Sequence, residues 1–118
     1  MLFANVNVNR EQLTLLSQLL LSAFPGCIIH QGRDPVRTIT HLPSQEVDAV
    51  FVDADTHPEV MHLLNRQKSN ASVYLLCRHD APPPQETDGI RSIITYPITR
   101  KKIQVALQTV PREIREVV

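Results

Sequence analysis

Two carboxylates follow an apolar run in the middle of the chain. Asp48 opens the run Ala49–Val52, Asp53 closes it, and Asp55 comes two residues later. A carboxylate at the end of a buried strand can act as a nucleophile or as a ligand for a hard cation. It can equally be a polar strand end or the cap of the following helix. Asp53 is the principal candidate, and Asp55 is either a helix cap or a second metal ligand.

Further candidate residues follow the other strand-like runs. Asn7 and Val8 lie at the end of the first run, Cys77 ends the fourth, and Tyr96 and Pro97 follow the fifth. In a doubly wound sheet, functional residues gather outside the carboxyl ends of the strands, near the switch in strand order. We therefore expect these residues to surround the candidate carboxylate.

The remaining nucleophiles and metal ligands do not form a recognisable site. Cys27 and Cys77 are far apart in sequence and do not make a disulfide framework, so we expect both to be small buried hydrophobes. His57 and His62 miss the i, i+4 spacing of a helical zinc site. The sequence has no G-x-G-x-x-G, P-loop or G-x-S-x-G motif, so dinucleotide, nucleoside triphosphate and esterase chemistry lack support.

The elements that position these residues alternate between strand and helix. The strand-like runs are Leu2–Val8, Cys27–His30, Val47–Val52, Ala71–Cys77 and Ile90–Thr95. Helical spacing follows each of the first three runs and the last one. Such alternation predicts a doubly wound α/β domain with a parallel sheet and right-handed crossovers. Pro82-Pro83-Pro84 cannot form a helix interior, so the helix between the fourth and fifth strands is expected to be short or missing.

Capping residues indicate where the helices begin. Asn9, with Gln12 as a weak capping box, Asp34 before Pro35, and Thr99 are the clearest signals. The apolar residues that we expect to face the core from the helices are Leu13, Leu15, Leu16, Leu19, Leu20, Phe24, Val36, Ile39, Leu42, Val60 or Met61, Leu63, Leu64, Ile103, Ala106, Leu107 and Val110.

Length and composition exclude several classes of function. The 118 residues fit a single domain over residues 1–118. Twelve Lys and Arg balance twelve Asp and Glu, so the chain has no general attraction for nucleic acids or anionic membranes. Three Phe, two Tyr and no Trp are too few for a base-stacking surface. The sequence shows no signal peptide and no apolar run long enough to span a membrane, which favours a cytoplasmic location.

The arrangement resembles the receiver domain of two-component response regulators over essentially the whole chain. The run Asp48–Asp53 resembles the family's third strand, which an acidic residue opens and the phosphoacceptor aspartate closes. Asn5–Leu13 resembles the first strand and its turn, Gly89–Ile90 the lead-in to the fifth strand, and Thr95–Thr99 the Lys-Pro segment before the last helix. The resemblance implies a flavodoxin-like, five-stranded parallel sheet of order 2-1-3-4-5.

The departures from the family pattern concern the residues that assist phosphorylation. The acidic pair that holds Mg²⁺ in the family corresponds to Asn7 and Val8. The family's Thr or Ser corresponds to Cys77 and its Lys to Tyr96, so only the acceptor, Asp53, is retained. Mg²⁺ needs carboxylate ligands, and a developing oxyanion needs a cation. The resemblance therefore implies a degenerate pocket with no cofactor, in which Mg²⁺ binding is weak or absent.

We therefore expect the chain to be a pseudo-receiver that takes part in two-component signalling or a phosphorelay. We do not expect it to be an enzyme. It would act through contact with another protein, with an output domain or with a second copy of the chain. Residues 111–118 resemble the beginning of a linker, and an output domain beyond it would commonly regulate transcription. Direct binding to nucleic acid or a membrane is not expected.

Two alternatives to the pseudo-receiver stay open. One is a receiver with slow residual phosphorylation of Asp53. The other is a small flavodoxin-like phosphocarrier enzyme, which would place its cysteine where Asn7–Asn9 stand.

Overall fold

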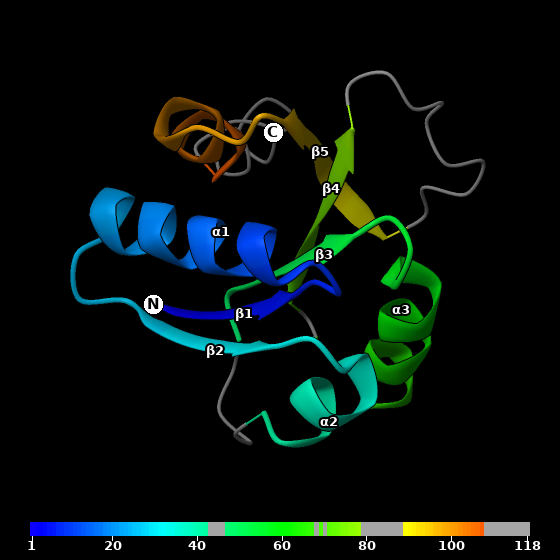
Figure 1. The fold of residues 1–118 in the computed structure, drawn as a ribbon. Helices are drawn as coiled ribbons and strands as arrows, with labels where there is room; N and C mark the ends of the chain where they lie inside the picture. The colour runs from blue at the N-terminus through cyan, green and yellow to red at the C-terminus, as the bar shows by residue number, and fades with distance from the viewer. Residues whose placement is uncertain (43–46, 68, 70, 79–88, 108–118) are drawn as a thin grey trace, which may run out of the picture.

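Five parallel strands form one sheet in the order β2-β1-β3-β4-β5. The computed structural model describes residues 1–42, 47–67, 69, 71–78 and 89–107 (Figure 1). The elements are β1 (Leu2–Val6), α1 (Arg10–Ala23), β2 (Ile28–Gly32), α2 (Pro35–Thr40), β3 (Ala49–Asp53), α3 (His57–Arg66), β4 (Ser72–Arg78) and β5 (Ile90–Tyr96). Residues 100–107 are also helical, and we call them the last helix. The predicted strand order is confirmed.

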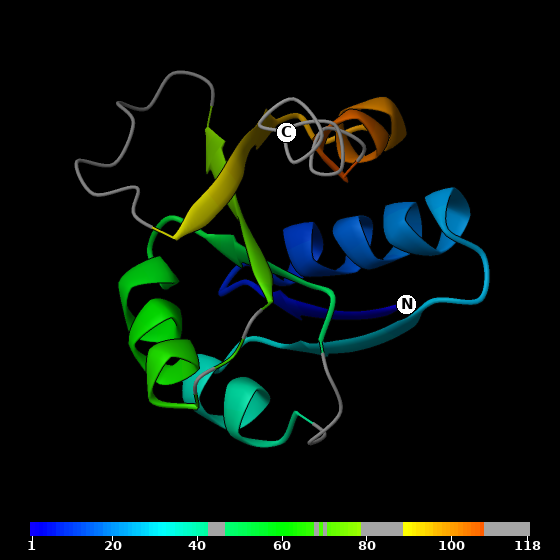
Figure 2. The same cartoon turned by 180° about the vertical axis from the view of Figure 1, so that it is seen from behind.

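Helices cover both faces of the sheet (Figures 1 and 2). α1 and the last helix lie on one face, and α2 and α3 lie on the other. Because side chains alternate along a strand, β1 directs Phe3 to the first face and Ala4 and Val6 to the second. All five residues of β3 are buried, as expected for a strand that is covered on both faces.

α1 begins at the predicted cap. The Asn9 side chain accepts a hydrogen bond from the Gln12 backbone N–H at 3.0 Å. The Asn9 N–H itself donates to the Asn7 side chain at 2.9 Å. That donor is therefore not used by Gln12, and the reciprocal half of the predicted capping box does not form.

The apolar stripe of α1 is narrower than the sequence predicts. Its buried residues are Leu13, Leu16 and Leu20, and Leu19 and Phe24 pack partly against them. Leu15, expected to widen the stripe, is 39% exposed. It directly precedes a buried residue, so it lies about 100° away around the helix axis and faces solvent.

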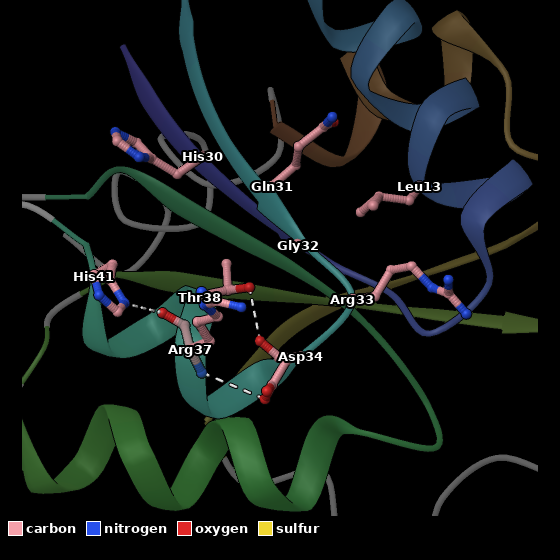
Figure 3. A pocket seen from close by; sticks show the side chains of 9 residues that line it. All are labelled: Leu13, His30, Gln31, Gly32, Arg33, Asp34, Arg37, Thr38 and His41. Carbon is pink, nitrogen blue, oxygen red and sulfur yellow. Dashed lines mark hydrogen bonds between the residues drawn. The ribbon is translucent and has the colours of Figure 1, made fainter.

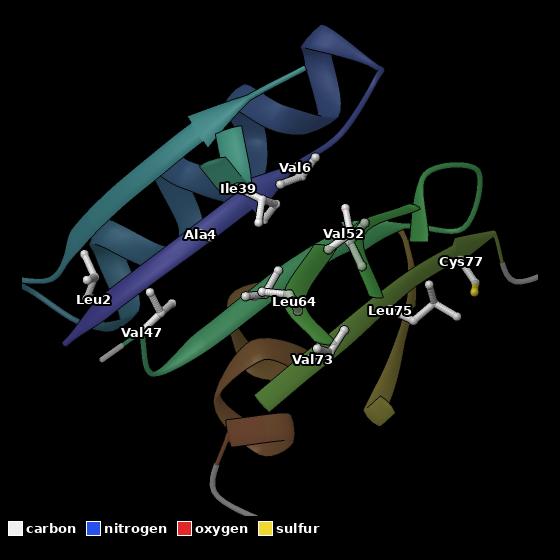
Figure 4. Packing of buried hydrophobic residues seen from close by; sticks show 12 residues of the cluster. Leu2, Ala4, Val6, Ile39, Val47, Val52, Leu64, Val73, Leu75 and Cys77 are labelled. Atoms are coloured by element: carbon white, nitrogen blue, oxygen red, sulfur yellow. The ribbon is translucent and has the colours of Figure 1, made fainter. Parts of the chain in front are cut away.

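On the other face, α2 and α3 pack against the strands through Ile39, Val60 and Leu64. Figure 4 shows Ile39 and Leu64 among the strand residues of this cluster. The expectation that Val36 faces the core is wrong, since it is 46% exposed. α2 is a helix of six residues that contacts the core through Ile39 and the following Leu42. A residue in its first turn therefore stays in solvent.

Asp48 joins the amino ends of the strands. Its Oδ2 accepts a hydrogen bond from the Leu2 N–H at 2.7 Å, and its own N–H donates to the Leu2 carbonyl at 2.9 Å. The Ser72 N–H donates to the Asp48 carbonyl at 3.3 Å. Asp48 lies at the opposite end of β3 from Asp53, and its side chain and backbone together join the starts of β1, β3 and β4.

Four of the five aromatic side chains pack against one another under α1 and the last helix. Ring centroids lie 5.7 Å apart for Phe3 and Phe24, 5.8 Å for Phe3 and Phe51, and 5.2 Å for Phe51 and Tyr74. Phe3, Phe51 and Tyr74 are fully buried, so these rings stabilise the core and are not exposed for base stacking. Tyr96 alone lies at the carboxyl ends of the strands.

Some predictions fall outside the described residues. They are the short or missing fourth helix, which concerns residues 79–88, the core position of Val110, and the linker at residues 111–118. Across the part of the chain that the structure describes, no helix has the length and apolar character needed to cross a membrane. The predicted cap of the last helix is confirmed, because the Lys102 N–H donates to the Thr99 hydroxyl at 3.2 Å.

Candidate functional site

Five of the predicted site residues meet at the carboxyl ends of the strands. Asn7 follows β1, Asp53 ends β3, Asp55 follows β3, Cys77 lies near the end of β4 and Tyr96 ends β5. Asp53, Asp55 and Cys77 all act electrostatically on the Tyr96 phenol, so these side chains share one environment. We call the five residues the Asp53 cluster.

Asn7 joins the first strand to the last element of the sheet. It is 1% exposed, and its Nδ2 donates to the Tyr96 hydroxyl at 3.1 Å. Its Oδ1 accepts from the Asn9 backbone N–H at 2.9 Å. The amide oxygen is the only side-chain atom of Asn7 that could bind a cation, and it already accepts a hydrogen bond from the backbone.

Asp53 is paired with a residue that the sequence analysis missed. The Thr56 hydroxyl donates a hydrogen bond to Asp53 Oδ1, and both side chains are buried. Thr56 is the N-cap residue of α3, but its side chain makes no capping bond. Neither Asp53 nor Asp55 caps the helix, so that alternative is wrong. The sequence does contain a signal for Thr56, because this threonine directly precedes His57-Pro58, and a proline at that place marks the beginning of a helix.

Two further predicted residues lie at the margin of the Asp53 cluster. Val8 is 41% exposed, and its carbonyl accepts from Arg33 Nε at 3.0 Å. Pro97 is also exposed, and its carbonyl accepts from Lys102 Nζ at 3.0 Å. Both residues contribute backbone acceptors, and neither side chain offers a polar atom to the carboxylates.

Burial raises the pKa of the Tyr96 phenol above its ordinary value. The hydrogen bond from Asn7 lowers this pKa, whereas the nearby charge of Asp53 raises it. The phenol is consequently neutral at physiological pH. Tyr96 can donate or accept a hydrogen bond, but it cannot supply positive charge to an anion beside Asp53.

Lys102 is held at the end of β5. Its Nζ donates to the carbonyls of Thr95 and Pro97, each at 3.0 Å, and approaches the Thr95 hydroxyl at 3.4 Å. An ammonium group has three protons, and these contacts account for all of them. Lys102 therefore stabilises the turn after β5. It does not supply the positive charge that a lysine in place of Tyr96 would provide.

Neither cysteine is prepared to act as a nucleophile. Burial raises the pKa of the Cys77 thiol, which is 7% exposed. Burial also raises the pKa of Cys27, which is only partly buried and lies 3.8 Å from the Leu20 carbonyl. A raised pKa disfavours the reactive thiolate. The predicted burial is confirmed for Cys77 and is incomplete for Cys27.

Two of the side-chain oxygens that the Asp53 cluster could offer to a hard divalent cation already accept hydrogen bonds. Mg²⁺ requires octahedral oxygen ligands. Asp53 Oδ1 accepts from Thr56, the Asn7 oxygen accepts from the backbone, and the Val8 side chain has no oxygen. Within the described ranges, no three or more His, Cys, Asp or Glu side chains are grouped to hold a metal ion.

Comparison with known proteins identifies the fold. No family model and no curated protein matches the sequence. A response regulator from Colwellia psychrerythraea superposes with a TM-score of 0.71 at 19% identity, over 95% of this chain and 97% of that chain. The chemotaxis response regulator CheY4 of Vibrio cholerae superposes with a TM-score of 0.76 at 15% identity, over 92% and 97% of the two chains.

A third solved structure is similar over almost the full length of both chains. The signal receiver domain of an HD domain-containing protein from Pseudomonas fluorescens has a TM-score of 0.71 at 22% identity, over 99% of this chain and 93% of that chain. Each of these similarities agrees with the parallel sheet of order β2-β1-β3-β4-β5. The chain therefore has the fold of the response regulator receiver domains, as the resemblance of its sequence implies.

Proposed function

We propose that the chain is a pseudo-receiver, a signalling module that acts through protein–protein contact and does not depend on Mg²⁺-assisted phosphorylation of Asp53. The observation that carries this proposal is the 3.1 Å hydrogen bond between Asn7 and Tyr96. It joins two neutral side chains next to the carboxylate, at positions that correspond to an acidic residue and a lysine of the receiver family.

Physical chemistry explains why this change matters. Transfer of a phosphoryl group to a carboxylate needs positive charge to stabilise the phosphoryl oxygens. Asn7 and Tyr96 offer only dipoles, and Lys102 is bound to the end of β5. The loss of one preorganised electrostatic partner commonly costs about a hundredfold in rate. The combined losses favour a module whose state is not set by phosphorylation.

Two alternatives differ in how well the site supports them. Slow residual phosphorylation of Asp53 is favoured by the nearby Asp55, whose exposed carboxylate could hold a cation weakly. A cysteine phosphocarrier is poorly supported, because Asn7 follows β1 and burial raises the pKa of the Cys77 thiol.

The proposed partner is another protein, an output domain or a second copy of the chain. The similar receiver domain from Pseudomonas fluorescens belongs to a protein that also has an HD domain, so in that protein the same fold accompanies a further domain. If this chain likewise regulates transcription, a DNA-binding domain would follow it in the same reading frame. We expect no nucleic-acid contact by the receiver-like domain itself, given its net charge of zero.

A titration that is monitored through the amide signals of an NMR spectrum tests the proposal. The ¹⁵N-labelled chain receives Mg²⁺ and then beryllofluoride, which imitates a bound phosphoryl group. We expect no site-specific shifts around Asp53, because the Asp53 cluster lacks the cation and the ligands that would hold either reagent.

Matched variants give the titration a clear alternative outcome. Asp53→Asn removes the acceptor, and Asp55→Asn removes the neighbouring carboxylate that could hold a cation. Shifts that centre on residue 53, vanish in Asp53→Asn and weaken in Asp55→Asn would favour slow phosphorylation over the pseudo-receiver. A phosphoenzyme that depends on a thiol would instead favour the phosphocarrier.

A further inference from the structure

A groove of about 670 Å³ lies along the end of β2, between α1 and α2 (Figure 3). Leu13 of α1 lines one side, His30–Gly32 belong to β2, and Arg33, Arg37 and His41 come from α2 and the segments that flank it. We call this the arginine groove. It shares no residue with the Asp53 cluster, and its size lies in the range of small-molecule sites.

The arginine groove is locally positive in a chain whose net charge is zero. Its lining includes two guanidinium groups, those of Arg33 and Arg37, and one carboxylate, that of Asp34, which gives a formal charge of +1. The Asp34 carboxylate is already engaged as the cap of α2, where its Oδ1 accepts from two backbone N–H groups at 3.1 and 3.4 Å. A ligand in the arginine groove would therefore meet a net positive charge.

Hydrogen bonds within the protein determine which atoms a ligand would meet. His41 Nδ1 lies 2.7 Å from the Arg37 carbonyl, which can only accept, so Nδ1 carries a proton. Nε2 of the neutral ring can then only accept, so the arginines and not His41 supply the donors for an anion. Arg33 uses its Nε on a carbonyl of the loop between β1 and α1, which leaves its terminal nitrogens. Gln31 Oε1 accepts from the Ser17 hydroxyl, so the amide nitrogen of Gln31 is left as a donor.

Close packing of β2 against α2 fixes the floor of the arginine groove. A Cβ on Gly32 would lie 2.0 Å from Thr38 Oγ1 and 3.2 Å from Thr38 Cβ, so this approach requires glycine. The Thr38 hydroxyl in turn donates to the Asp34 carbonyl at 2.7 Å. The base from which the arginines extend is therefore held by short contacts, which limits the cost of ordering the backbone of the groove when a ligand binds.

We infer that the arginine groove binds a small organic molecule with two separate anionic groups. Arg33 lies beside the beginning of α1, whereas Arg37 and His41 lie on α2 and at its end (Figure 3). Arginine binds both phosphate and carboxylate through paired hydrogen bonds. A lone inorganic phosphate would leave most of the 670 Å³ empty, but a molecule with an anionic group at each end would contact both sides.

The test compares fructose 1,6-bisphosphate with inorganic phosphate at constant ionic strength, because salt screens exposed charges. We expect the bisphosphate to shift the amide signals of Gly32, Arg33 and Thr38, and to bind at least about tenfold more tightly than phosphate. Citrate supplies carboxylates in place of phosphates. Whether citrate or the bisphosphate binds more tightly identifies the anionic group that the groove prefers.

Variants show whether both arginines take part. Arg33→Ala and Arg37→Ala should each weaken binding of the bisphosphate by about tenfold. Both side chains are exposed, so we expect both variants to fold, and Arg66→Ala on α3 is the matched control that should bind like the original chain. Equal affinity for phosphate and bisphosphate would overturn the inference, as would an equal loss in Arg66→Ala. Tighter binding of a glutamate-rich peptide would also overturn it, because the groove would then be a peptide site.

Discussion

The Asp53 cluster and the arginine groove lie at the carboxyl ends of strands in the same sheet, yet they use their polar atoms in opposite ways. In the cluster, the amide of Asn7 bonds to the phenol of Tyr96, and the Asp53 side chain is 7% exposed. In the groove, Arg33 and Arg37 are exposed and their charges face solvent. Asn7, Asp53 and Tyr96 of the cluster bond to groups within the protein, whereas the arginine groove leaves guanidinium nitrogens available.

The contrast separates what a fold provides from what its side chains provide. The fold brings residues together at the strand ends near the switch between β1 and β3, where ligands of doubly wound sheets usually bind. At that place the chain has Asn7 and Tyr96, and the positive charge lies beside the edge strand β2 instead. Position in a fold therefore indicates where to look, and the residues decide what can happen there.

The largest expected effect comes from giving the Asp53 cluster the residues that it lacks. The triple variant Asn7→Asp, Val8→Asp, Tyr96→Lys adds two carboxylates and one cation beside Asp53. We expect Mg²⁺ to bind at least about tenfold more tightly for each carboxylate, about 1.4 kcal/mol each. Without the metal, the neighbouring carboxylates repel one another and should lower the free energy of unfolding. Calorimetric titration and urea denaturation measure the two effects.

A charge-matched variant controls for added negative charge alone. Leu21 lies in α1, is 51% exposed and is distant in sequence from the cluster, so Leu21→Asp adds a carboxylate elsewhere on the surface. It should leave Mg²⁺ affinity unchanged. If the triple variant folds and binds Mg²⁺ no better than the original chain, the missing ligands are not what distinguishes the Asp53 cluster.

The next effect concerns the floor of the arginine groove. Gly32→Ala would place a Cβ 2.0 Å from Thr38 Oγ1, so either Thr38 rotates and loses its 2.7 Å bond to Asp34, or β2 and α2 move apart. We expect the free energy of unfolding to fall by about 1–3 kcal/mol, which urea denaturation would measure.

A second substitution sharpens this prediction. Thr38→Ala alone should cost about 1 kcal/mol through the lost hydrogen bond. It also removes the atom that a Cβ on Gly32 would meet, so the double variant should be more stable than the sum of the two single effects predicts. If the two losses of stability simply added in the double variant, contact with Thr38 would not be the reason why a larger side chain is unfavourable at position 32.

Local patterns in the sequence predict most of the fold. Asn9, Asp34 and Thr99 cap helices because each is a short polar residue directly before an apolar periodic segment. The apolar runs predict the strands for the same local reason. The predictions that Leu15 and Val36 face the core were wrong. The width of a buried face depends on how a helix packs against its sheet, which the sequence of a single helix does not reveal.

The two sites also differ in how well the sequence predicts them. The meeting of Asn7, Asp53 and Tyr96 could be predicted, since parallel strands end at one edge of the sheet. The arginine groove could not, because β2, α2 and α1 each contribute only part of it. Its two arginines stand four residues apart among balanced charges, and a net charge of zero conceals a local excess.

The smallest effect that we predict is a shift in the titration of Tyr96. Burial holds the folded-state pKa above the ordinary value of about 10, so folding favours the neutral phenol. Its contribution to stability is complete below the unfolded-state pKa, and it is lost as the pH rises through the folded-state pKa. Absorbance at alkaline pH, minus that of a Tyr96→Phe variant to remove the signal of Tyr74, would follow the ionisation.

Two substitutions should move this pKa in opposite directions. Asp53→Asn removes a negative charge that opposes ionisation, so the Tyr96 pKa should fall toward its ordinary value. Asn7→Leu removes the donor that stabilises the phenolate, so the pKa should rise further. If both variants titrated like the original chain, Tyr96 would not be coupled to the carboxylate or to the amide. The Asp53 cluster would then be a group of unrelated strand ends, and its contrast with the arginine groove would rest on charge alone.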